Sequence, residues 1–195
     1  TRQSEVERAR RIGRVLQNPL AGTAPNLTVA ENLALAIARG RPRGLGWALT
    51  AARRRRFEEE LAQLGLGLER RLDDRVGLLS GGQRQALSLL MATLQRPDIL
   101  LLDEHTAALD PRAAAIVADL TNRWVRQLRL TTLMITHNLE QAIRLGDRLI
   151  MMHEGRILFT VSGPEKQQLT IDGLRNAFER VRGEGFNYDR AVLAN

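Results

Sequence analysis

The chain has 195 residues, of which 44% are hydrophobic and 26% charged, a balance typical of a folded globular protein of one or one and a half domains. It has no cysteine, which excludes a disulfide framework and a thiolate metal site, and no apolar run approaches the length of a membrane span, so any membrane role requires a partner. The formal net charge is +7, but Lys166 is the only lysine among the 29 basic residues and only 4% of residues are aromatic. This composition favours solvated charged faces over a nucleic-acid surface.

The N-terminal part of the chain predicts one short strand. An apolar stretch from Ile12 to Leu16 ends at Gln17-Asn18-Pro19, because proline removes a backbone donor. Gln17 is therefore expected at a strand tip, where its amide either caps a loop or reaches a metal or a water molecule. Since the chain opens on Thr1 and not on methionine, we expect the true start to lie upstream.

A mostly helical block is predicted over residues 20–95. Thr28 followed by Glu31 forms a capping box that predicts a helix over residues 28–39, and apolar spacing predicts a second helix over residues 49–64. Glycine-rich and polar sequence predicts connecting segments at residues 40–47, 65–67 and 73–77.

The segment Leu79-Ser80-Gly81-Gly82-Gln83 precedes an apolar helical run that continues to Leu94. A helix that begins here directs free N–H groups towards an anion, glycine permits close approach of the backbone, and the Ser80 hydroxyl is a further donor. A serine-glycine turn is also common as an ordinary helix cap, and the motif alone leaves that alternative open.

Two carboxylates follow the next apolar run. Ile99 to Leu102 predicts a buried parallel strand, and Asp103 and Glu104 come directly at its carboxyl end, which is the edge of an α/β sheet where ligands bind. A carboxylate pair there suits a magnesium ion and an attacking water molecule. Taken alone, the pair is equally compatible with a helix start or a solvated loop.

The following segments repeat this strand and helix pattern. Asp110 before Pro111 predicts the start of a helix over residues 111–128, and the β-rich residues 131–136 predict a second buried strand that ends at His137. His137 is then expected at the same sheet edge as the carboxylates, although a histidine after a strand is usually a loop or cap residue. The apolar residues expected to face inward from this helix are Ile116, Val117, Leu120, Trp124 and Leu128.

The C-terminal part predicts a helix capped by Asn138 that runs to Leu145, and then a hairpin that turns at Glu154-Gly155. Asp172 is predicted to cap a short terminal helix. We expect four parts in all: 1–19, the end of an N-terminal core; 20–95, the helical subdomain; 96–163, the catalytic core; and 164–195, a C-terminal helix and tail.

The order of these motifs resembles the nucleotide-binding domain of ATP-binding cassette (ABC) transporters, over nearly the whole chain from Arg14 to about Phe159. The resemblance implies an α/β fold of the P-loop NTPase type, with the N-terminal part of the sheet core missing and an inserted α-helical subdomain. Leu-Ser-Gly-Gly-Gln followed by a strand that closes in Asp-Glu is a highly specific pair.

The resemblance also implies roles for the residues singled out above. Asp103 matches the aspartate that holds magnesium, and Glu104 matches the general base that polarises the attacking water. The remaining matches are Gln17, which approaches magnesium and the water; His137, which contacts the γ-phosphate; the nucleotide-binding signature Ser80, Gly81, Gly82 and Gln83; and Asp110, which crosses the dimer seam.

Two departures from the family pattern are visible. His105 stands where many relatives carry proline, which implies a different loop angle after Glu104. The family's phosphate loop, Gly-x-x-x-x-Gly-Lys-Ser/Thr, is not found in these 195 residues. We expect it upstream, so that the chain alone is inactive; the alternative is a truncated cassette that binds nucleotide poorly.

The implied function is that of an ATPase subunit that couples ATP hydrolysis to solute movement in a bacterial importer, with amino acids as the expected substrate class. ATP and Mg²⁺ are the expected cofactors. The expected partners are a second ATP-binding subunit in a homodimer, transmembrane permease subunits and a solute-binding protein, at the cytoplasmic face of the cell membrane and without nucleic acid. Two rival functions are a soluble cassette ATPase that is not tied to transport and a non-catalytic regulatory cassette.

Overall fold

The structure is a computed structural model that describes residues 2–41 and 46–183, with the last three of these described by their backbone alone. Contacts divide the chain into two compact units, Thr1–Ile135 and Thr136–Asn195. Each unit is described by itself below.

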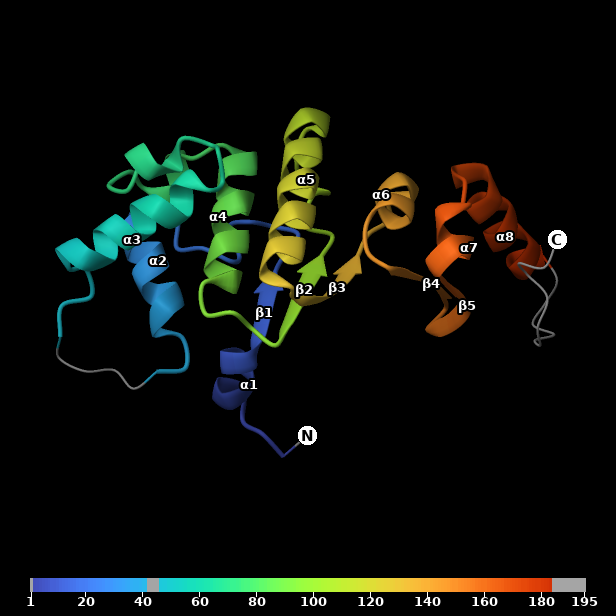
Figure 1. The fold of residues 1–195 in the computed structure, drawn as a ribbon, viewed down its shortest axis with the longest axis horizontal. Helices are drawn as coiled ribbons and strands as arrows, with labels where there is room; N and C mark the ends of the chain where they lie inside the picture. Colours follow the sequence, from blue (N-terminus) through green and yellow to red (C-terminus); the bar gives the residue numbers. More distant parts are fainter. Residues whose placement is uncertain (1, 42–45, 184–195) are drawn as a thin grey trace. The chain divides into compact units, whose positions relative to one another are not determined.

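A parallel sheet organises the first unit. Its strands are β1 (Ile12–Val15), β2 (Ile99–Asp103) and β3 (Thr131–Ile135), in that order across the sheet (Figure 1). All the described pairs are parallel, with Val15 opposite Leu102 and Asp103 opposite Ile135. The carboxyl ends of the three strands therefore meet at one edge, as the α/β prediction requires.

Helices precede and separate the first two strands. α1 (Glu5–Arg11) was not predicted, although Ser4 and Glu7 form a capping box at its start. α2 (Val29–Ala38), α3 (Ala51–Ala62) and α4 (Gly81–Thr93) lie between β1 and β2 in the chain and confirm the predicted helices to within a few residues. Two short 3-10 turns, Leu68–Arg70 and Val76–Leu78, join α3 to α4. Of the predicted loop at 40–47, residues 42–45 lie outside the described residues.

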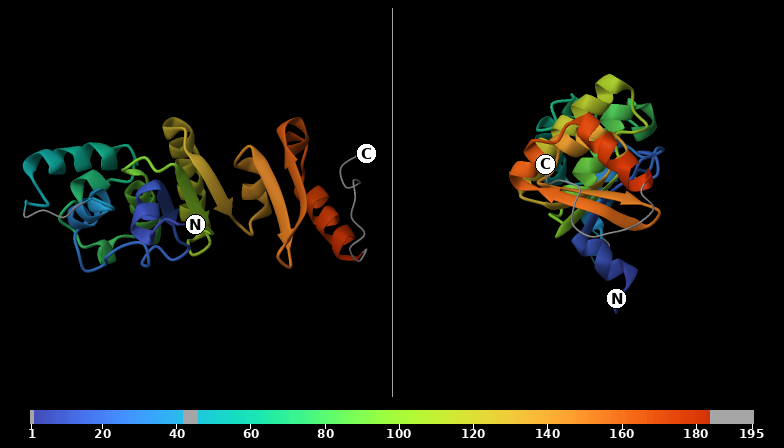
Figure 2. Two further views of the ribbon diagram at one scale, coloured as in Figure 1. Left: turned by 90° about the horizontal axis from the view of Figure 1, so that it is seen from below. Right: turned by 90° about the vertical axis from the view of Figure 1, so that its right-hand side faces the viewer.

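One face of the sheet carries the core. Burial alternates along β2, with Leu100 and Leu102 buried and Leu101 partly exposed, because successive side chains point to opposite faces. The buried side chains join those of α4 and of α5 (Pro111–Leu128) in one cluster. The ribbon views show α4 and α5 lying along the sheet (Figures 1 and 2). From α5 the cluster takes Leu120 and Trp124. Ile116 was expected inside but is 45% exposed, because it lies on the outer side of the same helix.

A second prediction, the burial of β3, is wrong. It was expected to be buried, but Leu133 is 52% exposed and Ile135 is 56% exposed. Among the described residues β3 pairs with β2 alone, so its other edge has no neighbouring strand. Burial of a strand requires covering elements on its faces, and its own sequence cannot supply them.

The second unit contains α6 (Leu139–Arg144), the antiparallel strands β4 (Arg148–His153) and β5 (Arg156–Ser162), α7 (Gly163–Gln167) and α8 (Ile171–Gly183). The predicted hairpin is confirmed, with positive φ at Glu154 and Gly155 as a tight hairpin turn demands. α7 was not predicted. Asp172 does not cap α8, because Thr170 Oγ1 instead accepts the N–H of Gly173 at 3.0 Å.

The only lysine of the chain lies in this unit. Lys166 is buried, and its ammonium donates to the backbone carbonyl of Ile143. Burial lowers the pKa of Lys166, and the nearby Asp147 carboxylate opposes that shift. No helix in residues 2–41 and 46–183 has the length and apolar character needed to cross a membrane.

Candidate functional site

The carboxyl edge of the sheet gathers three of the predicted site residues. Asp103 is the last residue of β2 and Glu104 follows it, while Gln17 comes two residues after β1 ends at Val15. Since Val15 is paired with Leu102, the chain segments that bear these residues leave the sheet side by side. Asp103 and Glu104 are partly buried and Gln17 is exposed.

Asp103 is paired with a cation on the sheet face opposite the helices. Arg14 Nη2 lies 3.1 Å from Asp103 Oδ2, and the two side chains are 60% and 42% exposed. An ion pair this exposed contributes at most about 1 kcal/mol to stability. The contact uses one carboxylate oxygen, Oδ2.

The side chains at this edge that could donate oxygen to the expected magnesium ion are those of Asp103, Glu104 and Gln17. The described residues contain no cluster of three or more histidine, cysteine, aspartate or glutamate side chains. Magnesium does not need such a cage, because it is usually held by one or two carboxylates together with substrate phosphates and water. Asp103 and Gln17 carry oxygen donors of the kind that magnesium takes, and their joint binding of an ion that arrives with a nucleotide stays a prediction.

Glu104 has an unusual backbone conformation. Its φ is +44°, in the left-handed region that residues other than glycine rarely occupy. Such a conformation costs about 1 to 3 kcal/mol and persists only where surrounding contacts enforce it. One of these contacts is the Glu104 N–H, which donates to the carbonyl of Ile135 at 3.0 Å and so joins the end of β2 to the end of β3.

His105, which no motif had assigned a role, is the next residue and is buried. Its Nε2 lies 3.1 Å from Thr121 Oγ1 in α5. Burial lowers the pKa of His105 to about 4, so the ring is neutral near pH 7. The sequence offered one signal for this residue, namely the absence of proline at the position.

Ser80 forms the N-cap of α4. Its hydroxyl oxygen accepts the N–H of Gln83 at 3.2 Å, and its own N–H donates to Gln83 Oε1 at 3.2 Å. The Ser80 hydroxyl proton is not used in this capping box. The Gln83 side chain also accepts a hydrogen bond from Arg71 and donates one to the carbonyl of Leu66. These bonds hold the side chain against the segment that joins α3 to α4.

The two signature glycines lie against the start of α5. A Cβ added at Gly81 would lie 3.1 Å from Leu109 Cδ2, and one added at Gly82 would lie 3.2 Å from the Cβ of Ala113. Asp110 caps α5, as predicted, by accepting the Ala113 N–H at 3.0 Å. The tip of α4 and the Asp110 turn are thus adjacent in the same chain.

Gln85 is a residue that sequence reasoning missed. It is fully buried in α4, and its Nε2 donates to the carbonyl of Leu16 at 3.0 Å, directly before Gln17. The two residues are 69 positions apart, so helical or strand spacing carries no signal for this contact.

His137 belongs to the second unit. It follows β3 by two residues and is exposed. Its placement with Gln17, Asp103 and Glu104 stays a prediction, as do the roles of all the site residues in binding or catalysis.

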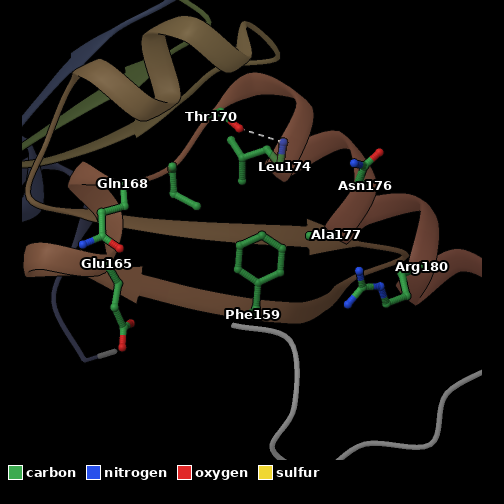
Figure 3. Close-up of a pocket in the computed structure, with 10 residues that line it drawn as sticks. Phe159, Glu165, Gln168, Thr170, Leu174, Asn176, Ala177 and Arg180 are labelled. Carbon is green, nitrogen blue, oxygen red and sulfur yellow. Dashed lines mark hydrogen bonds between the residues drawn. The ribbon is translucent and has the colours of Figure 1, made fainter. Parts of the chain in front are cut away.

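The second unit has a cavity of its own, about 340 Å³ in volume. Figure 3 shows Phe159 and Leu174 on its apolar side and Glu165 and Arg180 at its charged rim. None of the predicted site residues lines this cavity.

Comparisons with known proteins agree with the motif pattern. A family model described as ABC transporter matches residues 1–107. The chain is 45% identical over 179 residues to the tyrosine transport ATP-binding protein of Clostridioides difficile, covering 92% of this chain and 71% of that protein. It is 32% identical to the osmoprotectant import ATP-binding protein OsmV of Salmonella typhimurium, covering 80% of this chain but only 39% of that protein.

Solved structures show the same relationship. The dimeric ATP-binding cassette MJ0796, in a post-hydrolysis state bound to ADP and Pi, superposes with a TM-score of 0.64 at 29% identity, covering 83% of this chain and 68% of that one. The fold is shared with cbiO1 of Clostridium perfringens, part of the ABC transporter complex cbiONQ, with a TM-score of 0.67 at 22% identity and coverage of 90% and 64%. The family match, the relatives and the shared fold together show that this chain belongs to the ABC transporter family, among its ATP-binding cassette proteins.

Proposed function

We propose that the chain is part of the ATPase subunit of a bacterial importer, in which ATP hydrolysis drives solute across the membrane. The observation that carries this proposal is the position of Glu104 directly after Asp103 at the carboxyl edge of a parallel sheet, beside the end of β1 that leads to Gln17. A water molecule there has a carboxylate base in Glu104.

The proposed roles of the residues are those that the family resemblance implies, and their positions are compatible with them. Asp103 and Gln17 would hold Mg²⁺, which neutralises phosphate charge when it is bound with ATP. Ser80, Gly81 and Gly82 would present the hydroxyl and the free N–H groups of α4 to the γ-phosphate of ATP held by a second copy. Asp110, adjacent to those glycines, would cross the same seam, and His137 would contact the γ-phosphate.

The phosphate-binding lysine must come from another segment, because Lys166 is buried against the carbonyl of Ile143. The open edge of β3 supports this proposal, since β3 pairs with β2 alone among the described residues and a further strand can pair with its other edge. We place the lysine loop after such a strand. The 195-residue chain alone should then show little ATP turnover, and full turnover would contradict this part of the proposal.

The expected partners are a second cassette in a homodimer, transmembrane permease subunits and a solute-binding protein, at the cytoplasmic face of the membrane. Amino acids are the proposed substrate class, which is supported by the 45% identity to a protein named for tyrosine transport. Uptake of labelled tyrosine by the assembled transporter, compared with uptake of glycine betaine, tests the substrate class.

The test of the hydrolytic role is Glu104→Gln in the complete transporter. We expect turnover to fall at least about 100-fold while ATP-dependent dimerisation persists, because the amide keeps the shape but cannot accept a proton. Glu59→Gln is the matched control, since Glu59 is exposed on α3 and should leave turnover unchanged. Loss of ATP binding in Glu104→Gln would show that Glu104 is not the base.

A further inference from the structure

The backbone of Glu104 needs an anchor on its C-terminal side. Its left-handed φ of +44° is unfavourable, and its N–H is already held by the Ile135 carbonyl on the N-terminal side. Within the same turn the Ala107 N–H donates to the Glu104 carbonyl at 2.9 Å, which closes the loop but does not attach it to a helix.

His105 makes that attachment. The side chain is 2% exposed, and its Nε2 reaches Thr121 Oγ1 in the middle of α5. The Thr121 hydroxyl donates to the Val117 carbonyl at 2.7 Å, so its oxygen is left to accept. His105 must then donate from Nε2–H, which fixes both the tautomer and the direction of the ring.

We propose that His105 is a positioning residue for the hydrolysis reaction: its hydrogen bond to Thr121 locks the left-handed backbone of Glu104 and so aims the carboxylate at the attacking water. This inference rests on the proposed role of Glu104. His105 is buried and acts through the backbone of Glu104. It acts by joining the loop after β2 to α5, a helix whose Trp124 and Leu120 are buried in the core.

The test uses the complete transporter and two pairs of variants. His105→Ala and Thr121→Val each remove the hydrogen bond, whereas His105→Gln keeps a side-chain N–H donor and Thr121→Ser keeps the acceptor hydroxyl. The readout is the single-turnover rate constant of ATP hydrolysis, which does not depend on the fraction of folded protein. The ATP dissociation constant and the melting temperature are measured beside it.

We expect His105→Ala and Thr121→Val to lower the rate constant about 10- to 100-fold, because a displacement of about 1 Å at a catalytic group has effects of that size. The ATP dissociation constant should change less than about twofold, and His105→Gln and Thr121→Ser should retain most of the rate. A purely structural role would lower the melting temperature and leave the rate constant of the folded fraction unchanged, and that result would overturn the inference.

The outcomes separate this inference from the function on which it rests. If Glu104→Gln is inactive while Thr121→Val hydrolyses ATP at the normal rate, the positioning role is wrong and the base assignment stands. If Glu104→Gln turns over normally, the base assignment fails and the positioning role fails with it. If His105→Ala does not fold, the Thr121→Val and Thr121→Ser pair decides, because valine keeps the shape of threonine.

Discussion

Gln85 in α4 donates a hydrogen bond from its side-chain amide to the backbone carbonyl of Leu16, with 3.0 Å between the two atoms. Leu16 is the residue that separates β1 from Gln17, so the contact attaches the helix that begins at Ser80 to the segment that bears Gln17. The other polar atom of the same side chain, Oε1, is buried and has no hydrogen-bond partner among the described residues.

This contact predicts an ordering of two substitutions. Gln85→Ala leaves the Leu16 carbonyl unpaired and opens a cavity, and should lower the free energy of unfolding by about 3 kcal/mol. Gln85→Met loses the same hydrogen bond but fills the space and removes the unpaired Oε1, so its cost should be about 1 kcal/mol. Urea unfolding measures both. Equal costs would show that neither the cavity nor the unpaired Oε1 governs stability here.

The close contact between Gly82 and Ala113 at the start of α4 predicts that substitutions at these two positions have coupled effects on the free energy of unfolding. Gly82→Ala places a methyl group 3.2 Å from the Cβ of Ala113 and should lower the free energy of unfolding by about 1 to 2 kcal/mol. In the Ala113→Gly background the same change should cost about 0.5 to 1 kcal/mol less, because the crowding is removed.

The matched control for this pair is Gly46→Ala, since a Cβ added at Gly46 meets nothing within 4 Å. The measurement is made without nucleotide, so that weaker phosphate binding does not contribute. Additive costs of Gly82→Ala and Ala113→Gly would contradict the close approach of the two helix starts.

Asn32 holds together the loop that precedes α2. It is 1% exposed, its Oδ1 accepts the Ala24 N–H at 2.8 Å, and its Nδ2 donates to the carbonyls of Ala24 and Thr28 at 3.0 and 2.9 Å. Asn32→Ala leaves the Ala24 N–H unpaired, while the Ala24 and Thr28 carbonyls keep the backbone N–H groups of Leu27 and residue 32, and it should cost about 2 kcal/mol.

Asn32→Asp provides a sharper test of the same network. Near pH 7 it sets a buried carboxylate against the carbonyl oxygens of Ala24, Leu27 and Thr28, and it should destabilise at least as much as alanine. At pH 4 protonation of the carboxylate restores a donor, so the difference from the unsubstituted protein should shrink. Unfolding curves at the two pH values would show no such narrowing if Asn32 were exposed.

The lowered pKa of Lys166 predicts that the free energy of unfolding increases with pH in the alkaline range. Its pKa in the folded chain is lowered from 10.5, mainly by burial and against the pull of Asp147, so in the window just below 10.5 the unfolded chain binds more protons than the folded one. Stability should therefore increase as the pH rises through the folded pKa towards 10.5, and below the folded pKa this gain is absent.

The composition of the chain makes the effect of Lys166 easy to isolate in this pH range. Lys166 is the only lysine, cysteine is absent and there is one tyrosine, so few other groups titrate there. Lys166→Met should abolish the rise, as seen in thermal unfolding at steps between pH 8 and 10.5. A rise that persists in the methionine variant would assign it to another group.

Local chemistry was enough to predict the starts of α2, α4 and α5 in the first unit and the hairpin of the second. Thr28 and Glu31 satisfy each other's backbone donors, and Asp110 accepts the N–H of Ala113. These contacts join residues three positions apart, so they can be predicted from the sequence. The same rule applied to Ser4 and Glu7 would have found α1. At α8 the prediction named Asp172 as the N-cap, whereas Thr170 caps the helix, because threonine and aspartate can both accept a backbone N–H at a helix start.

Contacts between distant segments account for what the sequence did not reveal. The anchoring of His105 on Thr121 and of Gln85 on Leu16 depends on how α5 and α4 lie on the sheet, and no periodicity encodes that. The exposure of β3 depends on a neighbour that its own residues do not contain. The motifs thus placed Asp103 and Glu104 correctly at the carboxyl edge of the sheet. The hydrogen bonds that hold this edge to α4 and α5 could be found only from the folded structure.

The unpaired side of β3 has a practical consequence for handling the isolated chain. From Thr131 to Ile135 it offers backbone N–H and C=O groups beside the half-exposed Leu133 and Ile135, with no proline or inward charge to discourage a second strand. Two copies can add to each other along this side, and further copies can follow. Solutions of the 195-residue chain should therefore self-associate more as protein concentration rises, and Leu133→Lys should keep them dispersed.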